Sequence, residues 1–495
     1  MQIFLQGKLL GIEEFLLAPA AGTLDSDSLA DYTDQVFLGR SHWVSLLCEV
    51  LPRALLAEMG LAKILLGSSG GGQFMVLLPE ESRIDAEGLL RSAARDILHF
   101  SRGALRLVWS VTENLGDWSV IRKRLSDELE RVKHAPGFSP EIDVQMAESD
   151  AYFAQVLGWN LRDATSVGWS PSSPGMILLG GGKHNWQLGR DQTNPDNIPF
   201  VRHTAQSDDG QTSRPASGSV LASRAKGMAT WGVLRGDVDN FDIRIRRAQS
   251  IDEHLQFSVM FKQFFAGELE VQCSMPEYFR NVSVIYSGGD DFAVMGSWDS
   301  LIGLAGEMER LFHLFAGQNL KDFAGVEAKT ITLALALAPS VDASLGAVFE
   351  EAGRRLEAAK AVANDSFWLL GRTLEWKQFS DAASLKKLLL RMVTEFGCSP
   401  QYLKDLCGMY RETQSRMSKR QARRSGGERP WRYHRRLNRI LSAARTGARP
   451  NRIRGDFQKA RAALIADLIG RSAVSVKLRP AGRVALEWAR LSAET

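Results

Sequence analysis

The chain carries one pattern of strands and helices twice, and this internal repeat limits its fold more than any other feature of the sequence. In the second copy, apolar runs predict four strands, and apolar residues at helical spacing predict three helices. Their order, βαββαβ with a further helix, is that of a ferredoxin-like sheet. The predicted strands are Trp231–Gly236, Val282–Ser287, Phe292–Gly296 and Ile331–Ala338, and the predicted helices are Ile251–Phe265, Leu301–Phe315 and Leu345–Ala361.

The first copy has the same order at the start of the chain. Its strands are expected at IFLQG, AKILLG, FMVLL and ALRLVWSV, and its helices at Ser41–Ala57 and Ala86–Phe100. Acids follow the first strand and fill the central turn only in the second copy, so the first copy is expected to be degenerate. The aligned segments are Gly7-Lys8-Leu9-Leu10 with Gly236-Asp237-Val238-Asp239, and Ser69-Gly70-Gly71-Gly72-Gln73-Phe74 with Ser287-Gly288-Gly289-Asp290-Asp291-Phe292.

We therefore predict an α+β protein with two tandem ferredoxin-like palm domains, of the kind found in nucleotide cyclases and polymerases, and an α-helical C-terminal domain. A length of 495 residues suits several domains. The region Trp159–Lys226 is rich in Gly, Ser, Pro and Asn and predicts turns and loop. The predicted domains are a degenerate palm at 1–135, a helical and loop linker at 136–226, a catalytic palm at 227–376 and a basic helical domain at 377–495.

Composition excludes several classes of protein. Hydrophobic residues make up 44% and charged residues 24%, an ordinary balance for a soluble protein, and no apolar run is long enough to span a bilayer. The N-terminus lacks the pattern of a secretory signal, so we predict a cytoplasmic protein without membrane contact. The four cysteines include no C-x-x-C pair, and none of the eight histidines precedes an aspartate. Neither a zinc ribbon nor an H-D phosphohydrolase site is expected.

Four aspartates carry the expected chemistry. Asp237 and Asp239 end the first strand of the second palm, while Asp290 and Asp291 form the tip of the central hairpin. These strands are neighbours in a ferredoxin-like sheet, so the acids are expected to converge. Carboxylates suit two Mg²⁺ or Mn²⁺ ions, which in nucleotidyl transfer stabilise the attacking hydroxyl and the leaving pyrophosphate. The alternative is that Gly-Gly-Asp-Asp is only a good hairpin loop.

Three more residues are candidates for phosphate contact. Gly288 and Gly289 would let the backbone approach a triphosphate, although a turn alone also favours glycine. Lys360, on the last palm helix, would reach the terminal phosphates as a point charge. Its alternative is an ordinary solvated lysine.

The C-terminal part of the chain is strongly basic. The segment Arg411–Arg461 has a net charge of +14, so the remaining residues sum to −10. Arg432, Arg435 and Arg436 alternate with aromatic residues in WRYHRR, a composition that neutralises phosphates and stacks on unpaired bases. This segment predicts contact with RNA or, alternatively, docking to an acidic protein subunit.

LRGDVDN, YSGGDDF, the tandem palms and the basic tail together resemble the large, polymerase-like subunit of type III CRISPR effector complexes. The opening GKLLGIEEFL and the apparent helix start Gly39-Arg40-Ser41 extend the resemblance to the first palm, and GDVDN with WRYHRR is more similar to the Csm type. The resemblance implies ATP polymerisation into cyclic oligoadenylates when guide RNA in the complex pairs with target RNA. It also implies metal ligands and nucleotide contacts at given positions: Asp237, Asp290 and Asp291 for two ions, and Val238, Asp239, Asn240, Ser287, Gly288, Gly289 and Lys360 for ATP.

The sequence departs from that family in three ways. It opens directly in the first palm, so no H-D nuclease activity is expected. The zinc-binding cysteines often found between the palms are absent, and Phe241-Asp242 follows GDVDN where Leu-Gly is usual. Two other functions stay open, namely a diguanylate-cyclase-like enzyme and a catalytically silent RNA-binding scaffold.

Overall fold

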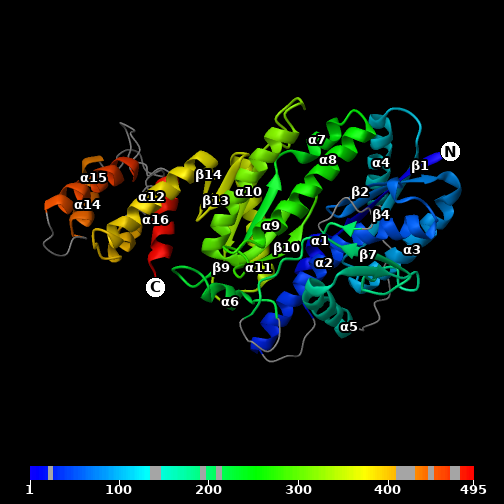
Figure 1. The fold of residues 1–495 in the computed structure, drawn as a ribbon, viewed down its shortest axis with the longest axis horizontal. Coiled ribbons are helices and arrows are strands. Elements are labelled where there is room, and N and C mark those ends of the chain that lie inside the picture. Colours follow the sequence, from blue (N-terminus) through cyan, green and yellow to red (C-terminus); the bar gives the residue numbers. More distant parts are fainter. Residues whose placement is uncertain are drawn as a thin grey trace, which may run out of the picture. The chain divides into compact units, whose positions relative to one another are not determined.

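The computed structural model describes residues 1–20, 26–133, 146–189, 197–207, 214–408, 430–443, 451–468 and 480–494 (Figure 1). The chain divides into two compact units. The first comprises Met1–Arg224, Thr230–Ile331 and Leu337–Arg354, and the second comprises Ala225–Ala229, Thr332–Ala336 and Arg355–Thr495. The first unit holds the whole first palm and the acid-bearing strands of the second.

The first palm is a four-stranded sheet in the order β2-β3-β1-β4. Its first strand pairs antiparallel with both the third and the fourth, as in a ferredoxin-like fold. Helix α3 buries Ala86, Leu90, Ala93 and Ile97, which recur every three to four residues along one face. The elements are β1 (Gln2–Leu10), α1 (Ile12–Leu17), α2 (Ser26–Glu58), β2 (Leu66–Gly70), β3 (Gln73–Pro79), α3 (Arg83–Phe100), β4 (Arg106–Glu113) and α4 (Trp118–Lys133).

Helix α2 begins earlier than expected, so Gly39-Arg40-Ser41 lies inside the helix and does not start it. Tertiary contacts explain the difference. A Cβ atom on Gly39 would lie 1.8 Å from the carbonyl oxygen of Phe153, which shows how closely the next segment packs there. The buried Arg40 guanidinium lies 2.9 Å from Asp150.

The second palm belongs to a six-stranded sheet in the order β10-β11-β9-β12-β13-β14. The first four strands have the ferredoxin-like order predicted from the sequence, and the hairpin β13-β14 was not predicted. The elements are β9 (Trp231–Val238), α7 (Phe241–Arg247), α8 (Ile251–Gln263), α9 (Leu269–Cys273), β10 (Val282–Ser287), β11 (Asp291–Ser297), α10 (Trp298–Asn319), β12 (Ile331–Leu337), α11 (Leu345–Val362), β13 (Ser366–Leu369) and β14 (Arg372–Glu375).

The strand registers confirm the repeat residue by residue. In each palm the central hairpin has an irregularity at the same place in its outer strand, and the two central strands pair with the aligned residues opposite one another. The equivalent pairs are Lys8↔Gln73 with Asp237↔Asp291, Gly7↔Phe74 with Gly236↔Phe292, and Gln6↔Met75 with Arg235↔Ala293. The irregularities lie between Leu66 and Ser68 and between Val284 and Tyr286.

Phenylalanine side chains fix one face of the acid-bearing hairpin. Phe292 is fully buried, and its ring centroid lies 5.8 Å from that of Phe265. Phe265, Phe261 and Phe264 in turn contact Phe312 of α10. Because side chains alternate along a strand, packing Phe292 into this core directs its neighbour Asp291 to the opposite face.

The region predicted as turns and loop contains a small sheet in the order β6-β5-β7-β8, so that prediction was wrong in part. Its strands are only two to five residues long, too short to show a periodic pattern, and the buried Trp169 and Trp186 anchor two of them. Helix α5 (Met146–Ala151) precedes this region, whose elements are β5 (Ser166–Trp169), β6 (Leu178–Leu179), β7 (His184–Leu188), β8 (Asn197–Ile198) and α6 (Gly218–Ser223).

The chain beyond β14 is mainly helical where the structure describes it, as predicted, with turns and a bridge residue at 395–400. Helix α12 buries Leu385, Leu389 and Met392, and Phe379 stacks on Trp488 of α16 with ring centroids 5.8 Å apart. The bounds of the four predicted domains stay a prediction. No helix among the described residues is long and apolar enough to cross a membrane. The helices are α12 (Trp376–Thr394), α14 (Pro430–Ala443), α15 (Asn451–Leu468) and α16 (Pro480–Ala493).

Candidate active site

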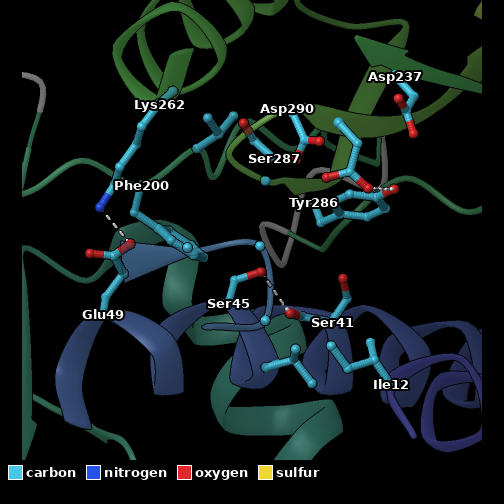
Figure 2. A pocket seen from close by; sticks show the side chains of 18 of the residues that line it. Ile12, Ser41, Ser45, Glu49, Phe200, Asp237, Lys262, Tyr286, Ser287 and Asp290 are labelled. Carbon is cyan, nitrogen blue, oxygen red and sulfur yellow. Dashed lines mark hydrogen bonds and ion pairs between the residues drawn. The ribbon is translucent and has the colours of Figure 1, made fainter. Parts of the chain in front are cut away.

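A cavity of about 310 Å³ lies within the first compact unit and takes its walls from both palms (Figure 2). Helix α2 and the β2-β3 turn form the wall of the first palm. Strand β9, helix α8 and the β10-β11 turn form the wall of the second. The two turns face each other, because a Cβ atom on Gly71 would lie 3.8 Å from the backbone nitrogen of Gly289.

The three predicted metal ligands all line this cavity. Asp237 and Asp291 are register partners on β9 and β11, so their side chains share one face of the sheet, with Cβ atoms about 4.5–5.5 Å apart. Asp290 lies in the turn, and its carbonyl oxygen accepts the Val238 N–H at 2.9 Å. The strand end and the hairpin tip thus come together as the sequence predicts.

The donor set fits Mg²⁺ or Mn²⁺, because all three side chains supply oxygen. Two carboxylates at paired positions also repel each other, and a divalent cation between them would relieve that repulsion. No group of three or more His, Cys, Asp or Glu side chains is already arranged to hold a metal in the described parts of the chain. Binding two ions would therefore require the aspartates to adjust their side chains.

The two glycines of the turn have different surroundings. The Gly288 N–H donates to the Asp291 carbonyl at 2.7 Å, and a Cβ atom on Gly288 would lie 2.1 Å from Asp291 Oδ1. A Cβ atom on Gly289 would meet nothing within 4 Å. The absence of a side chain therefore matters at Gly288, where it leaves room for the carboxylate.

Two residues that the sequence analysis missed, Tyr286 and Arg235, also line the cavity. The Tyr286 hydroxyl donates to Asp291 Oδ2 at 2.8 Å, and burial together with the Asp291 charge raises the pKa of Tyr286 well above its usual value. The Arg235 charge acts on both Tyr286 and Asp291, and the Arg235 guanidinium carbon lies 4.3 Å from the ring centroid of Phe349. The signal that could have identified them is their place inside the motifs LRGDVDN and YSGGDDF.

The predicted nucleotide contacts divide into two groups. Ser287 and Gly288 line the cavity, and the buried Ser287 hydroxyl has no hydrogen-bond partner among the described residues. Asp239 does not line the cavity, since its carboxylate is buried and accepts the Thr330 hydroxyl at 2.7 Å. The Val238 side chain is buried too, and Asn240 has a left-handed backbone (φ 58°) at the start of α7. Lys360 belongs to the second compact unit, on α11.

An ion pair that joins the palms forms another part of the cavity wall. Lys262 of α8 lies 2.6 Å from Glu49 of α2, and it donates to Ser69 of the first-palm turn at 2.9 Å. Arg53 contacts the other Glu49 oxygen at 2.7 Å. Burial opposes ionisation of Glu49, but the charges of Lys262 and Arg53 hold its pKa below the usual value. No sequence pattern predicts the pairing of Glu49 with Lys262, because the two residues are 213 positions apart.

The candidate RNA contacts lie on α14, in the second compact unit. The Arg435 side chain is exposed and Arg436 is half-buried. The Arg432 side chain lies outside the described residues. The role of this helix stays a prediction.

Comparison with known proteins agrees with this geometry. Residues 230–367 match the family described as Cas10/Cmr2, second palm domain. A Mycobacterium tuberculosis protein, CRISPR system single-strand-specific deoxyribonuclease Cas10/Csm1 (subtype III-A), is 32% identical over 122 residues, which are 21% of this chain and 15% of the relative. The protein of that name from Enterococcus italicus is 29% identical over 172 residues, 34% of this chain and 21% of the relative. These alignments span about a fifth or less of the relatives' length.

Solved structures match over almost the whole chain. A Csm1–Csm4 subcomplex of the type III-A interference complex matches with a TM-score of 0.68 and 16% identity, over 100% of this chain and 70% of the other. A Csm1–Csm4 cassette in complex with one ATP matches with a TM-score of 0.67 and 17% identity, over 99% of this chain and 70% of the other. At such identities these structures establish the fold. With the matches in sequence, they confirm the predicted resemblance to the Cas10/Csm1 large subunits of type III-A CRISPR systems.

Proposed function

We propose that this chain joins ATP molecules into cyclic oligoadenylates, as the polymerase subunit of an RNA-guided type III complex. One observation carries the proposal: in the palm copy that keeps its acids, Asp237, Asp290 and Asp291 line one cavity with the unsatisfied Ser287 hydroxyl. Related Csm1–Csm4 cassettes, which have the same fold, have been solved with one ATP, pppApApA, cA3 and cA4. These ligands support a nucleotide as the occupant here.

The chain's own residues would share the work as follows. Asp237, Asp290 and Asp291 would hold two divalent ions, which supply charge stabilisation for the attacking 3′-oxygen and the leaving pyrophosphate. The Ser287 hydroxyl would donate to a phosphate oxygen, since it has no partner among the described residues. Gly288, which has no side chain, leaves room for the Asp291 carboxylate. Lys360 is our candidate for contact with the terminal phosphates of ATP.

We also infer the partners of the complex. The structural relatives are subunits of Csm1–Csm4 assemblies, which supports a Csm4-type neighbour for this chain. Guide and target RNA would meet the basic segment that includes Arg432, Arg435 and Arg436. Binding of target RNA would then switch on synthesis.

A diguanylate-cyclase-like reaction is the second candidate, because GGDDF fits the motif of that related palm. The palms of this chain are unequal, however, with Lys8 and Gln73 standing where the active copy has Asp237 and Asp291. A symmetric product of two equivalent active halves is therefore disfavoured. The retained acids likewise disfavour a silent scaffold.

The test is to change Asp290 and Asp291 together to alanine and to incubate the assembled complex with target RNA, Mn²⁺ and radiolabelled ATP. We expect loss of oligoadenylate synthesis with unchanged assembly, because the change removes charge from a cavity and leaves the core intact. Asp237→Ala should behave alike. Synthesis retained by the double variant would refute the assignment, and a product formed from GTP alone would favour the cyclase reading.

A further inference from the structure

The two palms differ at two positions besides their acids. The strand registers make Tyr286 equivalent to Ser68, and Arg235 equivalent to Gln6. The copy without acids thus also lacks the tyrosine and the arginine that lie beside Asp291 in the cavity wall. The repeat provides an internal comparison in which these two residues and the acids are present or absent together.

In the acid-bearing palm, both oxygens of Asp291 have defined surroundings. Oδ2 accepts the Tyr286 hydroxyl at 2.8 Å, while Oδ1 lies 2.1 Å from the position that a Cβ atom on Gly288 would occupy. The hydroxyl on one side and the bare Gly288 backbone on the other therefore define one orientation of the carboxylate. In the other palm, Gln6 and Gln73 are joined only by an exposed amide hydrogen bond of 3.5 Å.

Arg235 is itself held in place. Its guanidinium lies over the Phe349 ring of α11, and a Cβ atom on Gly353 of the same helix would lie 2.3 Å from the Arg235 Nη1 atom. The glycine thus provides the space that the arginine fills. From this position the Arg235 charge acts on Tyr286 and Asp291, and the Tyr286 ring makes an edge contact with Phe349 at 6.2 Å. Contacts with Phe349 of α11 thus hold both Arg235 and Tyr286 beside Asp291.

We propose that Tyr286 and Arg235 are positioning residues that hold the Asp291 carboxylate in the orientation in which it binds a divalent cation. The inference rests on the proposed function, because it assumes that Asp291 is a metal ligand. A hydrogen-bond donor behind a ligating carboxylate fixes which oxygen faces the ion, and loss of such a partner typically weakens metal affinity about 10–100-fold. Tyr286 and Arg235 themselves do not need to touch the nucleotide.

The test is a titration of the full chain with Mn²⁺ alone, in which electron paramagnetic resonance measures the bound and free ion. Tyr286→Phe keeps the buried ring and removes the hydroxyl, so we expect Mn²⁺ affinity to fall about 10–100-fold. Arg235→Gln copies the residue of the first palm and should weaken affinity in the same direction, which gives a second measurement if Tyr286→Phe is poorly folded. Raising Mn²⁺ should restore much of the lost ATP turnover.

Tyr152→Phe is the matched control, since the Tyr152 hydroxyl is also engaged, with Ile177 at 2.8 Å, but does not line the cavity. Its Mn²⁺ affinity should equal that of the unchanged chain. Asp291→Asn defines the full loss of the site. If Asp291→Asn loses Mn²⁺ while Tyr286→Phe and Arg235→Gln bind it normally, the positioning role is refuted and the proposed function stands. Equal weakening in Tyr286→Phe and Tyr152→Phe refutes the positioning role too. Unchanged affinity in Asp291→Asn would refute the metal assignment itself.

Discussion

Gly288→Ala should abolish most activity, whereas Gly289→Ala should leave it nearly unchanged, although the two glycines are neighbours in one motif. The new methyl group at position 288 would lie 2.1 Å from Asp291 Oδ1, and real Cβ contacts are essentially never below 3.0 Å. The carboxylate is the flexible partner, so it would move by about 1 Å. A displacement of that size in a catalytic group costs on the order of 100-fold in rate.

The methyl group at position 289 meets no atom within 4 Å, and neither glycine has a positive φ angle that alanine would resist. Backbone strain therefore does not separate the two variants, and both should fold. The assay is pyrophosphate release from ATP by the assembled complex with target RNA, at saturating Mn²⁺. Thermal unfolding of both variants is the control for folding.

Equal activity of the two variants would refute the reasoning. If both lose activity equally, the glycines act through backbone approach to the triphosphate, as the sequence alone suggests. If both stay active, Asp291 does not need the orientation seen in the structure. A drop in the unfolding temperature of Gly288→Ala alone would show that the methyl group displaces the backbone and not the carboxylate.

Two further predictions concern other parts of the chain. Burial, with a contribution from Asp31, raises the pKa of Asp34 to about 7, although its carboxylate accepts the Leu345 N–H at 2.9 Å. The folded state therefore keeps a proton that the unfolded state loses, so stability should fall as pH rises from about 4 to about 7, by at most about 1.4 kcal/mol per pH unit. When the unfolding temperature is measured against pH, the Asp34→Asn variant should lack this fall in stability between about pH 4 and about pH 7. A pH profile equal to that of the unchanged chain would contradict the prediction. Changing Arg432, Arg435 and Arg436 to glutamate should weaken RNA association most at low salt, and an unchanged salt slope would favour subunit docking.

The repeat and the place of the acids could be predicted because each depends on local pattern. Apolar runs define the strands, and the turn before Phe292 defines the hairpin, so the ferredoxin-like order was enough to predict that Asp237 and Asp291 converge. The predicted convergence of these acids follows from the strand order of the sheet. The apolar pattern was sufficient to locate these strands because they are buried and six to eight residues long.

Residues that act through distant partners could not be predicted. Asp239 looked like an active-site acid, but its carboxylate is taken by Thr330, which lies 91 residues along the chain. Tyr286 and Arg235 look like ordinary strand residues until the register places them beside Asp291. The short strands of the small sheet and the hairpin β13-β14 were missed for a related reason. A strand of two to five residues is too short to show a detectable periodic pattern.

The last prediction is that adding acids to the first palm will not create a second catalytic centre. Gly72 and Gln73 align with Asp290 and Asp291, but the turns have different backbones, since Gly72 has a φ angle of +76° and the second turn has no positive φ at its glycines. An aspartate at position 72 would be strained, and its Cβ would lie 2.7 Å from Ile12. An aspartate at position 73 would face Lys8, which supplies no ligand.

The first palm therefore serves the site as a wall, through its glycine turn and through Glu49, which holds Lys262 of the other palm at 2.6 Å. A wall has no need of acids, yet it must keep its shape for the cavity to form. We expect Gly72→Asp with Gln73→Asp to give no gain in ATP turnover per chain, measured with Asp237, Asp290 and Asp291 intact. Doubled turnover would show that the two palms are interchangeable and that the difference in turn geometry is without consequence.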